Sequence, residues 1–343
     1  MRSHMSKLFE PFSLKSLQLK NRIVMPPMCM YSAGTDGIAT SWHNIHYSSR
    51  AIGGAGLIIQ EATAVEKRGR LSNHDLGLWT DDQITPLSKI ADLVHEFGAK
   101  IALQIAHGGR KAWAGEENIV APSPIKFPTS DTVPEQLSLS QISQVLESFS
   151  YAAERAVKAG YDAIEIHAAH GYLIHEFISP YTNKRTDKYG GDKLNRLNFP
   201  IEVIKAVKAA IPSDMPLLMR ISAVEYLDEG YTFEDMIEAV GVFKKHGLDL
   251  IDVSSGGASQ NPPPTWPGFQ LPYAQKIKSE IGIPAIGCGL IRDPLMAADA
   301  VEKDMVDLIA IGRGQLADPH WAIKASKTLN VQGIVPWQYE RAF

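Results

Sequence analysis

Residues 161–172 read Tyr-Asp-Ala-Ile-Glu-Ile-His-Ala-Ala-His-Gly-Tyr, a mainly apolar run that ends in a cluster of polar rings. The run predicts a buried strand, with His167, His170 and Tyr172 at its end. Residues three apart on a continuing strand point to opposite faces, so both histidines can face one ligand only if the chain turns out of the strand near Ala168. Strand C-terminal ends are where α/β folds place their chemistry.

Similar short apolar runs recur along the whole chain. Together with 163–169 they are 22–28, 57–63, 100–106, 217–222, 250–254, 283–287 and 308–311. Amphipathic stretches with helical spacing lie between most of them, and Gly98, Gly160 and Gly247 read as helix stops before the next strand. A strand followed by a helix, eight times over, predicts the α/β class and a single (β/α)8 TIM barrel.

Two long segments interrupt this rhythm, residues 108–137 and 179–192, and we expect them to form extended βα loops over the C-terminal face. No shift in composition suggests a second domain, so residues 5–343 are predicted to form one domain. Residues 1–4 resemble a cloning scar ahead of Met5. The tail, residues 335–343, carries Trp337, Tyr339 and Phe343 around Arg341, so we expect it to dock at a subunit interface.

The composition excludes several classes of protein. Of the residues, 45% are hydrophobic and 21% are charged, which excludes a disordered chain. The formal net charge of −4, without any basic run, argues against a nucleic-acid partner and favours a small-molecule one. No apolar stretch approaches the roughly 18 residues that span a membrane, and no signal peptide is evident, so we expect a cytoplasmic protein. Two cysteines, Cys29 and Cys288, do not support a disulfide framework, a zinc ribbon or an iron–sulfur cluster.

Glycines follow the seventh and eighth predicted strands, as Gly287-Cys288-Gly289 and Gly312-Arg313-Gly314. The loops after these strands are the habitual phosphate site of TIM barrels, and Arg313 would add a bidentate contact. The alternative is that the glycines only form tight turns. Residues 287–292 lack the third glycine of the dinucleotide fingerprint, which disfavours a Rossmann cofactor site.

Gln104 and Arg220 lie within otherwise apolar strands, where an unpartnered amide or guanidinium is costly to bury. A planar heterocycle rich in donors and acceptors, such as an isoalloxazine, would satisfy both. Internal pairing, for example between Arg220 and Glu165, would satisfy them equally well.

Three interpretations of His167 and His170 are possible. They could be zinc ligands together with His43, His46 or His107, or core residues bonded to the backbone. As paired N–H donors they would grip a carbonyl oxygen, each donor contributing roughly 3 kcal/mol where water is excluded. Tyr172 favours the third reading, because a phenol with a pKa of about 10 keeps its proton at neutral pH and can act as an acid.

Several motifs together resemble one known family over the whole chain. They are Leu-Lys-Asn-Arg-Ile-Val-Met-Pro-Pro-Met-Cys at 19–29, His-Ala-Ala-His-Gly-Tyr-Leu at 167–173, the loop 183–191, and Ile-Gly-Arg at 311–313. This set resembles the old yellow enzyme family of flavin-dependent ene-reductases. Cys29 and the tail residues 338–341 are similar to its thermophilic-like branch, often called NADPH dehydrogenases.

The resemblance implies noncovalently bound FMN at the barrel mouth, with NADPH or NADH as reductant in the same pocket and no metal. The implied cofactor-binding residues lie along the ring, at its pyrimidine part or at the phosphate: Pro26, Pro27, Met28, Cys29, Ala62, Gln104, Arg220, Gly287, Gly289, Gly312 and Arg313. Cys29 would adjust the flavin potential and substrate binding.

The resemblance also implies the chemistry, which is ping-pong reduction of the C=C bond of α,β-unsaturated carbonyl compounds. His167 and His170 would bind the carbonyl oxygen, flavin N5 would deliver hydride to the β-carbon, and Tyr172 would protonate the α-carbon. Tyr31 and Lys111 would be further substrate contacts. Arg341 would reach into the neighbouring active site of a homodimer or homotetramer.

Two alternatives remain at this point. A metal-dependent TIM-barrel hydrolase would use the histidine cluster. A noncatalytic flavin-binding barrel would bind FMN without turning over an alkene.

Overall fold

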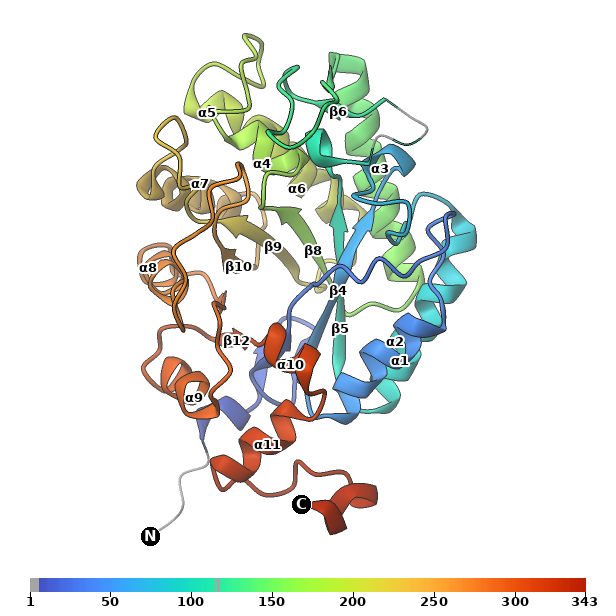
Figure 1. Ribbon diagram of the computed structural model, residues 1–343, viewed down its shortest axis with the longest axis vertical. Coiled ribbons are helices and arrows are strands. Elements are labelled where there is room, and N and C mark those ends of the chain that lie inside the picture. The colour runs from blue at the N-terminus through green and yellow to red at the C-terminus, as the bar shows by residue number, and fades with distance from the viewer. Residues whose placement is uncertain (1–5, 114, 116–117) are drawn as a thin grey trace.

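A closed barrel of eight parallel strands forms the centre of the molecule (Figure 1). The computed structural model describes residues 6–113, 115 and 118–343, so the suspected cloning scar at 1–4 lies outside the described residues. The barrel strands are β3 (Ile23–Met25), β4 (Leu57–Ala64), β5 (Lys100–Ala106), β8 (Ala163–Ala168), β9 (Leu217–Ser222), β10 (Leu250–Ser254), β11 (Ala285–Gly287) and β12 (Leu308–Ala310). Pairing of β12 with β3 closes the ring, which confirms the predicted TIM barrel.

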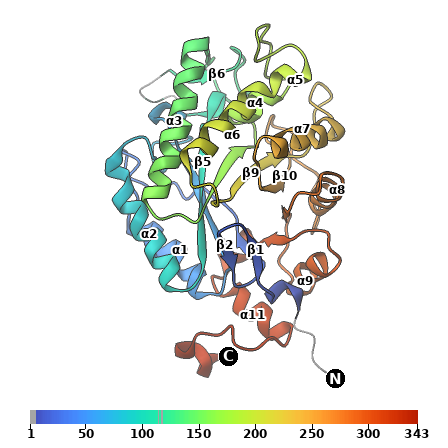
Figure 2. The same ribbon diagram turned by 180° about the vertical axis from the view of Figure 1, so that it is seen from behind.

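Helices surround this barrel on its outer side (Figures 1 and 2). They are α1 (Ser41–Ile52), α2 (Ile84–Glu96), α3 (Leu139–Lys158), α4 (Leu173–Ile178), α5 (Lys193–Arg196), α6 (Asn198–Ala210), α7 (Phe233–Lys245), α8 (Leu271–Ile281), α9 (Pro294–Glu302), α10 (Arg313–Ala317) and α11 (Trp321–Thr328). The three predicted helix-stop glycines have left-handed backbones, with φ of +72° at Gly98, +86° at Gly160 and +110° at Gly247. Glycine is favoured there because it has no Cβ to clash. No helix among the described residues is long and apolar enough to cross a membrane.

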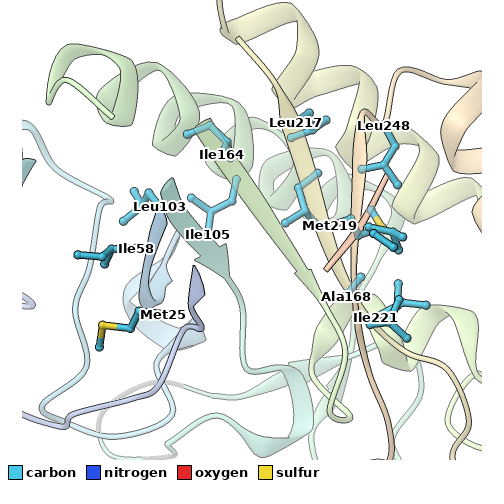
Figure 3. Close-up of a cluster of buried hydrophobic side chains, with 14 of the residues drawn as sticks. Met25, Ile58, Leu103, Ile105, Ile164, Ala168, Leu217, Met219, Ile221 and Leu248 are labelled. Carbon is cyan, nitrogen blue, oxygen red and sulfur yellow. The ribbon is translucent and has the colours of Figure 1, made fainter. Parts of the chain in front are cut away.

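Alternate strand residues pack on opposite sides of the barrel wall. One set, including Ile58, Leu103, Ile164, Met219 and Ile221, belongs to the cluster shown in Figure 3, which includes many helix residues. The intervening set forms a separate inner cluster that includes Leu57, Ile59, Ala102, Ala163, Leu218 and Leu250. Two positions after Ala163, Leu218 and Leu250, the inward-facing residues are polar: Glu165, Arg220 and Asp252. The barrel interior is therefore apolar toward its N-terminal end and polar near its mouth.

An N-terminal hairpin of β1 (Phe12–Leu14) and β2 (Leu17–Leu19) was not predicted. Leu17 and Leu19 are buried and belong to the inner cluster, so the hairpin closes the N-terminal end of the barrel. The long segment 108–137 contains another short pair, β6 (Val120–Ala121) and β7 (Glu135–Gln136).

The C-terminal tail forms a 3-10 helix at Trp337–Ala342 and lies beyond α11 (Figure 1). It borders a cavity of about 540 Å³ that is also lined by Gly54, Phe97 and Gly98. These residues shortly precede β4 and β5, so the tail lies at the N-terminal end of the barrel, away from the mouth of its own chain.

Candidate active site

The end of β8 brings the polar rings together. The strand stops at Ala168, and the next turn has left-handed backbone at His170 (φ +60°) and Gly171 (φ +73°). The ring centroids of His167 and His170 are therefore 5.2 Å apart, and Nε2 of His167 lies 3.4 Å from Nδ1 of His170. The predicted departure of the chain from the strand near Ala168 is confirmed.

Hydrogen bonds from other elements hold this turn. The Lys111 ammonium donates to the backbone oxygens of His170 at 2.8 Å and Gly257 at 3.2 Å. The backbone N–H of His170 donates to Ser222 Oγ at 3.0 Å. The N–H of Gly171 donates to Nδ1 of His175 at 3.0 Å. Lys111, predicted as a substrate contact, is thus engaged with the backbone behind the histidine pair.

Both site histidines are neutral at ordinary pH. Burial lowers the pKa of His167 and of His170 well below the usual range, and the positive charges of Arg220 and Lys111 lower both further. Nδ1 of His167 accepts the backbone N–H of Ala169 at 3.2 Å, so the proton of this ring is on Nε2, the nitrogen that faces His170.

Tyr172 precedes α4 as its N-cap and completes the cluster, with its ring centroid 4.8 Å from that of His167. Burial, followed by the nearby Cys29 and Tyr31, raises its pKa well above the ordinary value, so the phenol keeps its proton. The Lys111 ammonium lies 4.8 Å from the centroid of the Tyr172 ring, and burial lowers the pKa of Lys111 to about 8.

Cys29 and Tyr31 follow β3. Burial, with the negative charges of Asp75 and Glu61, raises the pKa of Cys29 far above that of a free thiol, so its sulfur is protonated. The segment is held from behind, because the carboxylate of Glu61 accepts the N–H of Met30 at 2.7 Å. Tyr31 is exposed and has a left-handed backbone, with φ of +51°.

Gln104 and Arg220 find partners inside the barrel. Nε2 of Gln104 donates to Glu165 at 2.7 Å, and Nη1 of Arg220 lies 2.8 Å from the carboxylate of Asp252. Arg220 therefore pairs with Asp252, directly opposite it on β10, rather than with Glu165 as the internal-pairing alternative proposed. One atom each of Arg220 (Nε), Glu165 (Oε1) and Asp252 (Oδ1) is buried without a partner.

A cavity of about 380 Å³ adjoins these residues at the barrel mouth, within the roughly 300–1,000 Å³ typical of ligand sites. It is lined by Pro26, Pro27, Met28, Arg220, Ser254, Phe269, Gln270, Cys288, Gly289, Leu290, Ile291, Arg292, Ala310, Gly312, Arg313, Gly314 and Leu316. Three of these residues are arginines and none is acidic. A cleft of mixed polar and apolar lining, with one buried arginine and two exposed ones, suits a planar heterocycle that carries a phosphate. The unpartnered Nε of Arg220 is a donor for the heterocycle. The residues fit FMN.

Several cofactor residues predicted from sequence line this cavity: Pro26, Pro27, Met28, Arg220, Gly289, Gly312 and Arg313. Gly287 does not line the cavity. A Cβ at this position would collide with the side chains of Val306 and Leu271. Ala62 and Gln104 are buried on β4 and β5 and do not line it. Arg341 is exposed on the tail at the other end of the barrel.

Several residues that line the cavity were not predicted from sequence as cofactor contacts, among them Ser254, Phe269, Gln270, Cys288 and Arg292. Ser254 is the last residue of β10, so the strand-end rule that selected His167 would have found it. Gln270 belongs to a loop without a periodic pattern, and nothing in the sequence marks it.

The other histidines are engaged elsewhere. His43 accepts the N–H of Thr40 at 3.0 Å, His46 lies 3.0 Å from the guanidinium of Arg50, and His107 accepts the N–H of Gly109 at 3.1 Å. Within the part of the chain that the structure describes, no three His, Cys, Asp or Glu side chains lie so that they could hold a metal ion.

Known proteins resemble the chain over almost its whole length. Residues 7–332 match the NADH:flavin oxidoreductase / NADH oxidase family. NADPH dehydrogenase of Geobacillus thermodenitrificans is 47% identical over 337 residues, 98% of each chain. Morphinone reductase superposes with a TM-score of 0.84 at 28% identity, covering 96% of this chain and 91% of that one. A 2-naphthoyl-CoA reductase complex superposes with a TM-score of 0.89 at 26% identity over 94% of this chain, which spans only 52% of that larger one.

The family match, the barrel and the mouth cavity agree with one another. The chain belongs to the NADH:flavin oxidoreductase / NADH oxidase family, which includes old yellow enzyme, and is an oxidoreductase that uses FMN and NAD(P)H.

Proposed function

We propose that the protein is an ene-reductase that reduces the C=C bond of α,β-unsaturated carbonyl compounds. The observation that carries the proposal is the convergence of two neutral imidazoles, with Nε2 of His167 3.4 Å from Nδ1 of His170, beside a protonated phenol. One oxygen atom can lie within hydrogen-bonding distance of both nitrogens.

FMN, when bound, takes a hydride from NAD(P)H and gives it to an acceptor. Arg220 would hold its pyrimidine part, because this guanidinium is buried at the mouth and keeps an unpartnered Nε. Arg313 would hold the phosphate together with the turns at Gly289 and Gly312.

His167 and His170 would bind the substrate carbonyl as donors. Negative charge develops on that oxygen when the β-carbon accepts hydride, and fixed N–H groups in a dry site stabilise it, each by roughly 3 kcal/mol. The neutral state of both rings leaves their N–H groups available without the cost of burying two positive charges.

Tyr172 would supply the proton for the α-carbon. Because its pKa is raised, the phenol keeps its proton until a strongly basic carbon develops next to it. Cys29, as a protonated thiol, would contact the cofactor and substrate rather than attack them, and Tyr31 would lie at the exposed rim.

Steady-state kinetics test this function. FMN-loaded protein should oxidise NADPH faster in the presence of 2-cyclohexenone than with cyclohexanone, which lacks the C=C bond. A chelator should leave the rate unchanged. Binding of FMN without any acceleration by the enone would support the noncatalytic flavin-binding barrel instead.

We further propose that the protein works as a homodimer or homotetramer in which Arg341 enters the partner's active site. Support comes from the tail, where Trp337 is 77% exposed and Arg341 is exposed at the far end of the barrel from its own mouth. Exposed apolar area of this kind favours a protein interface.

A further inference from the structure

We propose that Ser254 and Gln270 are positioning residues that fix which ring nitrogen of His170 carries the proton. The inference deepens the proposed function and rests on it, because it concerns the second donor to the substrate oxygen. It assigns a task to two cavity residues that come from the end of β10 and from the loop before α8.

His170 can donate to a ligand only from Nδ1. Nδ1 of His170 lies 3.4 Å from Nε2 of His167, whereas Nε2 of His170 lies 2.8 Å from Ser254 Oγ. If the proton were on Nε2, the lone pair of Nδ1 would face the substrate oxygen and would accept the proton that His167 offers. That tautomer would consume the donor of His167 inside the protein and leave the carbonyl without either bond.

The hydroxyl of Ser254 selects between the two tautomers. Among the described residues its oxygen has two hydrogen-bond partners, Nε2 of Gln270 at 3.2 Å and Nε2 of His170 at 2.8 Å. The amide nitrogen of Gln270 is a donor, so the ring nitrogen of His170 is the acceptor open to the hydroxyl proton. A hydroxyl can donate to Nε2 only if this nitrogen is unprotonated, and the proton of the neutral ring is then on Nδ1.

Gln270 is itself held in one orientation. Its amide nitrogen also donates to Ser255 Oγ at 2.8 Å, while its oxygen lies 3.0 Å from Sγ of Cys288. Burial raises the pKa of Cys288 to about 12, so this sulfur is a thiol. Its proton faces two carbonyl oxygens, that of Gln270 and the backbone oxygen of Val253 at 3.3 Å. An amide flipped by half a turn would set its N–H₂ group against the S–H donor.

The tautomer is measurable in the FMN-loaded protein by long-range ¹H–¹⁵N spectra of ¹⁵N-histidine-labelled samples. We expect Nδ1–H for His170 in the wild type. Gln270→Glu should reverse this state, because a carboxylate accepts the Ser254 proton and turns the hydroxyl oxygen into an acceptor for Nε2–H. Ser254→Ala should give a mixture, and Ser254→Thr should restore Nδ1–H.

Ser255→Ala is the matched control, since it removes a neighbouring hydroxyl that bonds to Gln270 but not to the ring of His170. It should keep Nδ1–H. Ser254→Ala should also weaken binding of 4-hydroxybenzaldehyde, followed by the flavin spectrum, about tenfold, the effect of one lost hydrogen bond to a partly charged oxygen.

The two proposals fail separately. Nε2–H in the wild type, or an unchanged tautomer in both Gln270→Glu and Ser254→Ala, would overturn the positioning role even if the phenol binds tightly. The expected tautomers in a wild-type protein that binds no phenol would instead overturn the assignment of the histidine pair to a carbonyl. Circular dichroism and FMN content establish that each variant is folded.

Discussion

At the scale of single residues, the proposed function has both imidazoles bind the same substrate oxygen, so loss of either should impair catalysis. We predict that His167→Ala and His170→Ala each weaken phenol binding about tenfold or more. Both should slow reoxidation of the reduced enzyme by an enone more than its reduction by NADPH. The reason is that, in the proposed function, the histidines stabilise negative charge on the substrate oxygen, and this charge develops only when the enone accepts hydride.

Stopped-flow absorbance of the flavin separates the two half-reactions. His246→Ala serves as a control, because this ring is bonded to the backbone of its own helix at Val242, far along the chain from the site. Unchanged phenol affinity in both site variants would contradict the carbonyl-binding role.

Tyr172→Phe removes the phenolic proton while it keeps the ring that packs against His167. We expect the oxidative half-reaction to slow by roughly 100-fold, the lower range for loss of a general acid. Phenol binding should change little. An unaltered rate of alkene reduction would show that solvent supplies the proton.

Glu61 makes stability depend on pH. Burial raises its pKa in the folded protein to about 7, although Tyr47 and Met30 both donate to it. Between the unfolded value of about 4.3 and this value, the folded state binds more protons, so the free energy of unfolding falls as pH rises. The loss is on the order of 3 kcal/mol in total.

Urea unfolding at several pH values checks this expectation. In Glu61→Gln the carboxyl is gone, so the wild type should lose stability relative to the variant from about pH 4.5 to 7 and then run parallel to it. His46, whose pKa burial lowers to about 4, is present in both proteins and cancels in the difference. His43 has a similarly lowered pKa, but its Nε2 lies 3.6 Å from the Glu61 carboxyl, so the difference reports Glu61 together with this neighbour. A difference that does not vary with pH would contradict the raised pKa of Glu61.

At the scale of elements, the site depends on how β8 ends. Gly171 has φ of +73°, and a Cβ there would collide with the backbone oxygen of Gly257. Gly171→Ala should therefore cost about 1–3 kcal/mol from backbone strain, with a further loss from the collision. It should also displace His170 and weaken phenol binding.

Gly160→Ala is the matched control for this substitution. Gly160 has a similar φ of +86°, but a Cβ there meets nothing within 4 Å. It should therefore lose stability through strain alone and keep the affinity for phenol. Equal effects of both substitutions on phenol binding would argue against a special role for the turn.

The elements were predictable where the pattern is strong. All eight barrel strands follow from short apolar runs, because strands buried on both faces leave a continuous hydrophobic signal. The hairpin β1–β2 was missed because each of its three-residue strands has an exposed polar residue at its centre, so neither leaves the continuous apolar run that marks the equally short β3, β11 and β12.

Within the site, the sequence predicted only the residues at the ends of the strands. His167, His170 and Arg220 stand out as polar residues in apolar strands. The partner of Arg220 does not, because strand register selects Asp252 over Glu165, and no sequence pattern contains the register. The contact between His170 and Ser254 joins residues 84 positions apart and becomes visible only in the folded barrel.

At the scale of the whole molecule, the tail is the part that the barrel does not require. We predict that removal of residues 337–343 lowers the oligomeric state and raises the KM for the enone several-fold. The barrel should stay folded, because the described tail residues are largely exposed. Light scattering and steady-state kinetics measure both effects, with Arg341→Ala to separate the charge from the interface.

A tail-deleted protein with the mass and kinetics of the full chain would contradict this assembly. If Arg341→Ala alone raises the KM while the mass is unchanged, the arginine acts at the site of the partner. If only the complete deletion has an effect, the aromatic residues serve the interface and the arginine has no part in binding.

In the proposed function, the histidine pair and Tyr172 direct hydride to an activated C=C bond. The most direct test mixes FMN-loaded, anaerobically reduced protein with 2-cyclohexenone in a single turnover and identifies the product by gas chromatography. We predict one equivalent of cyclohexanone per reoxidised flavin, and a much slower reaction in the His167→Ala, His170→Ala double variant. An allylic alcohol as product, or a flavin that stays reduced, would contradict the proposed reduction of the C=C bond.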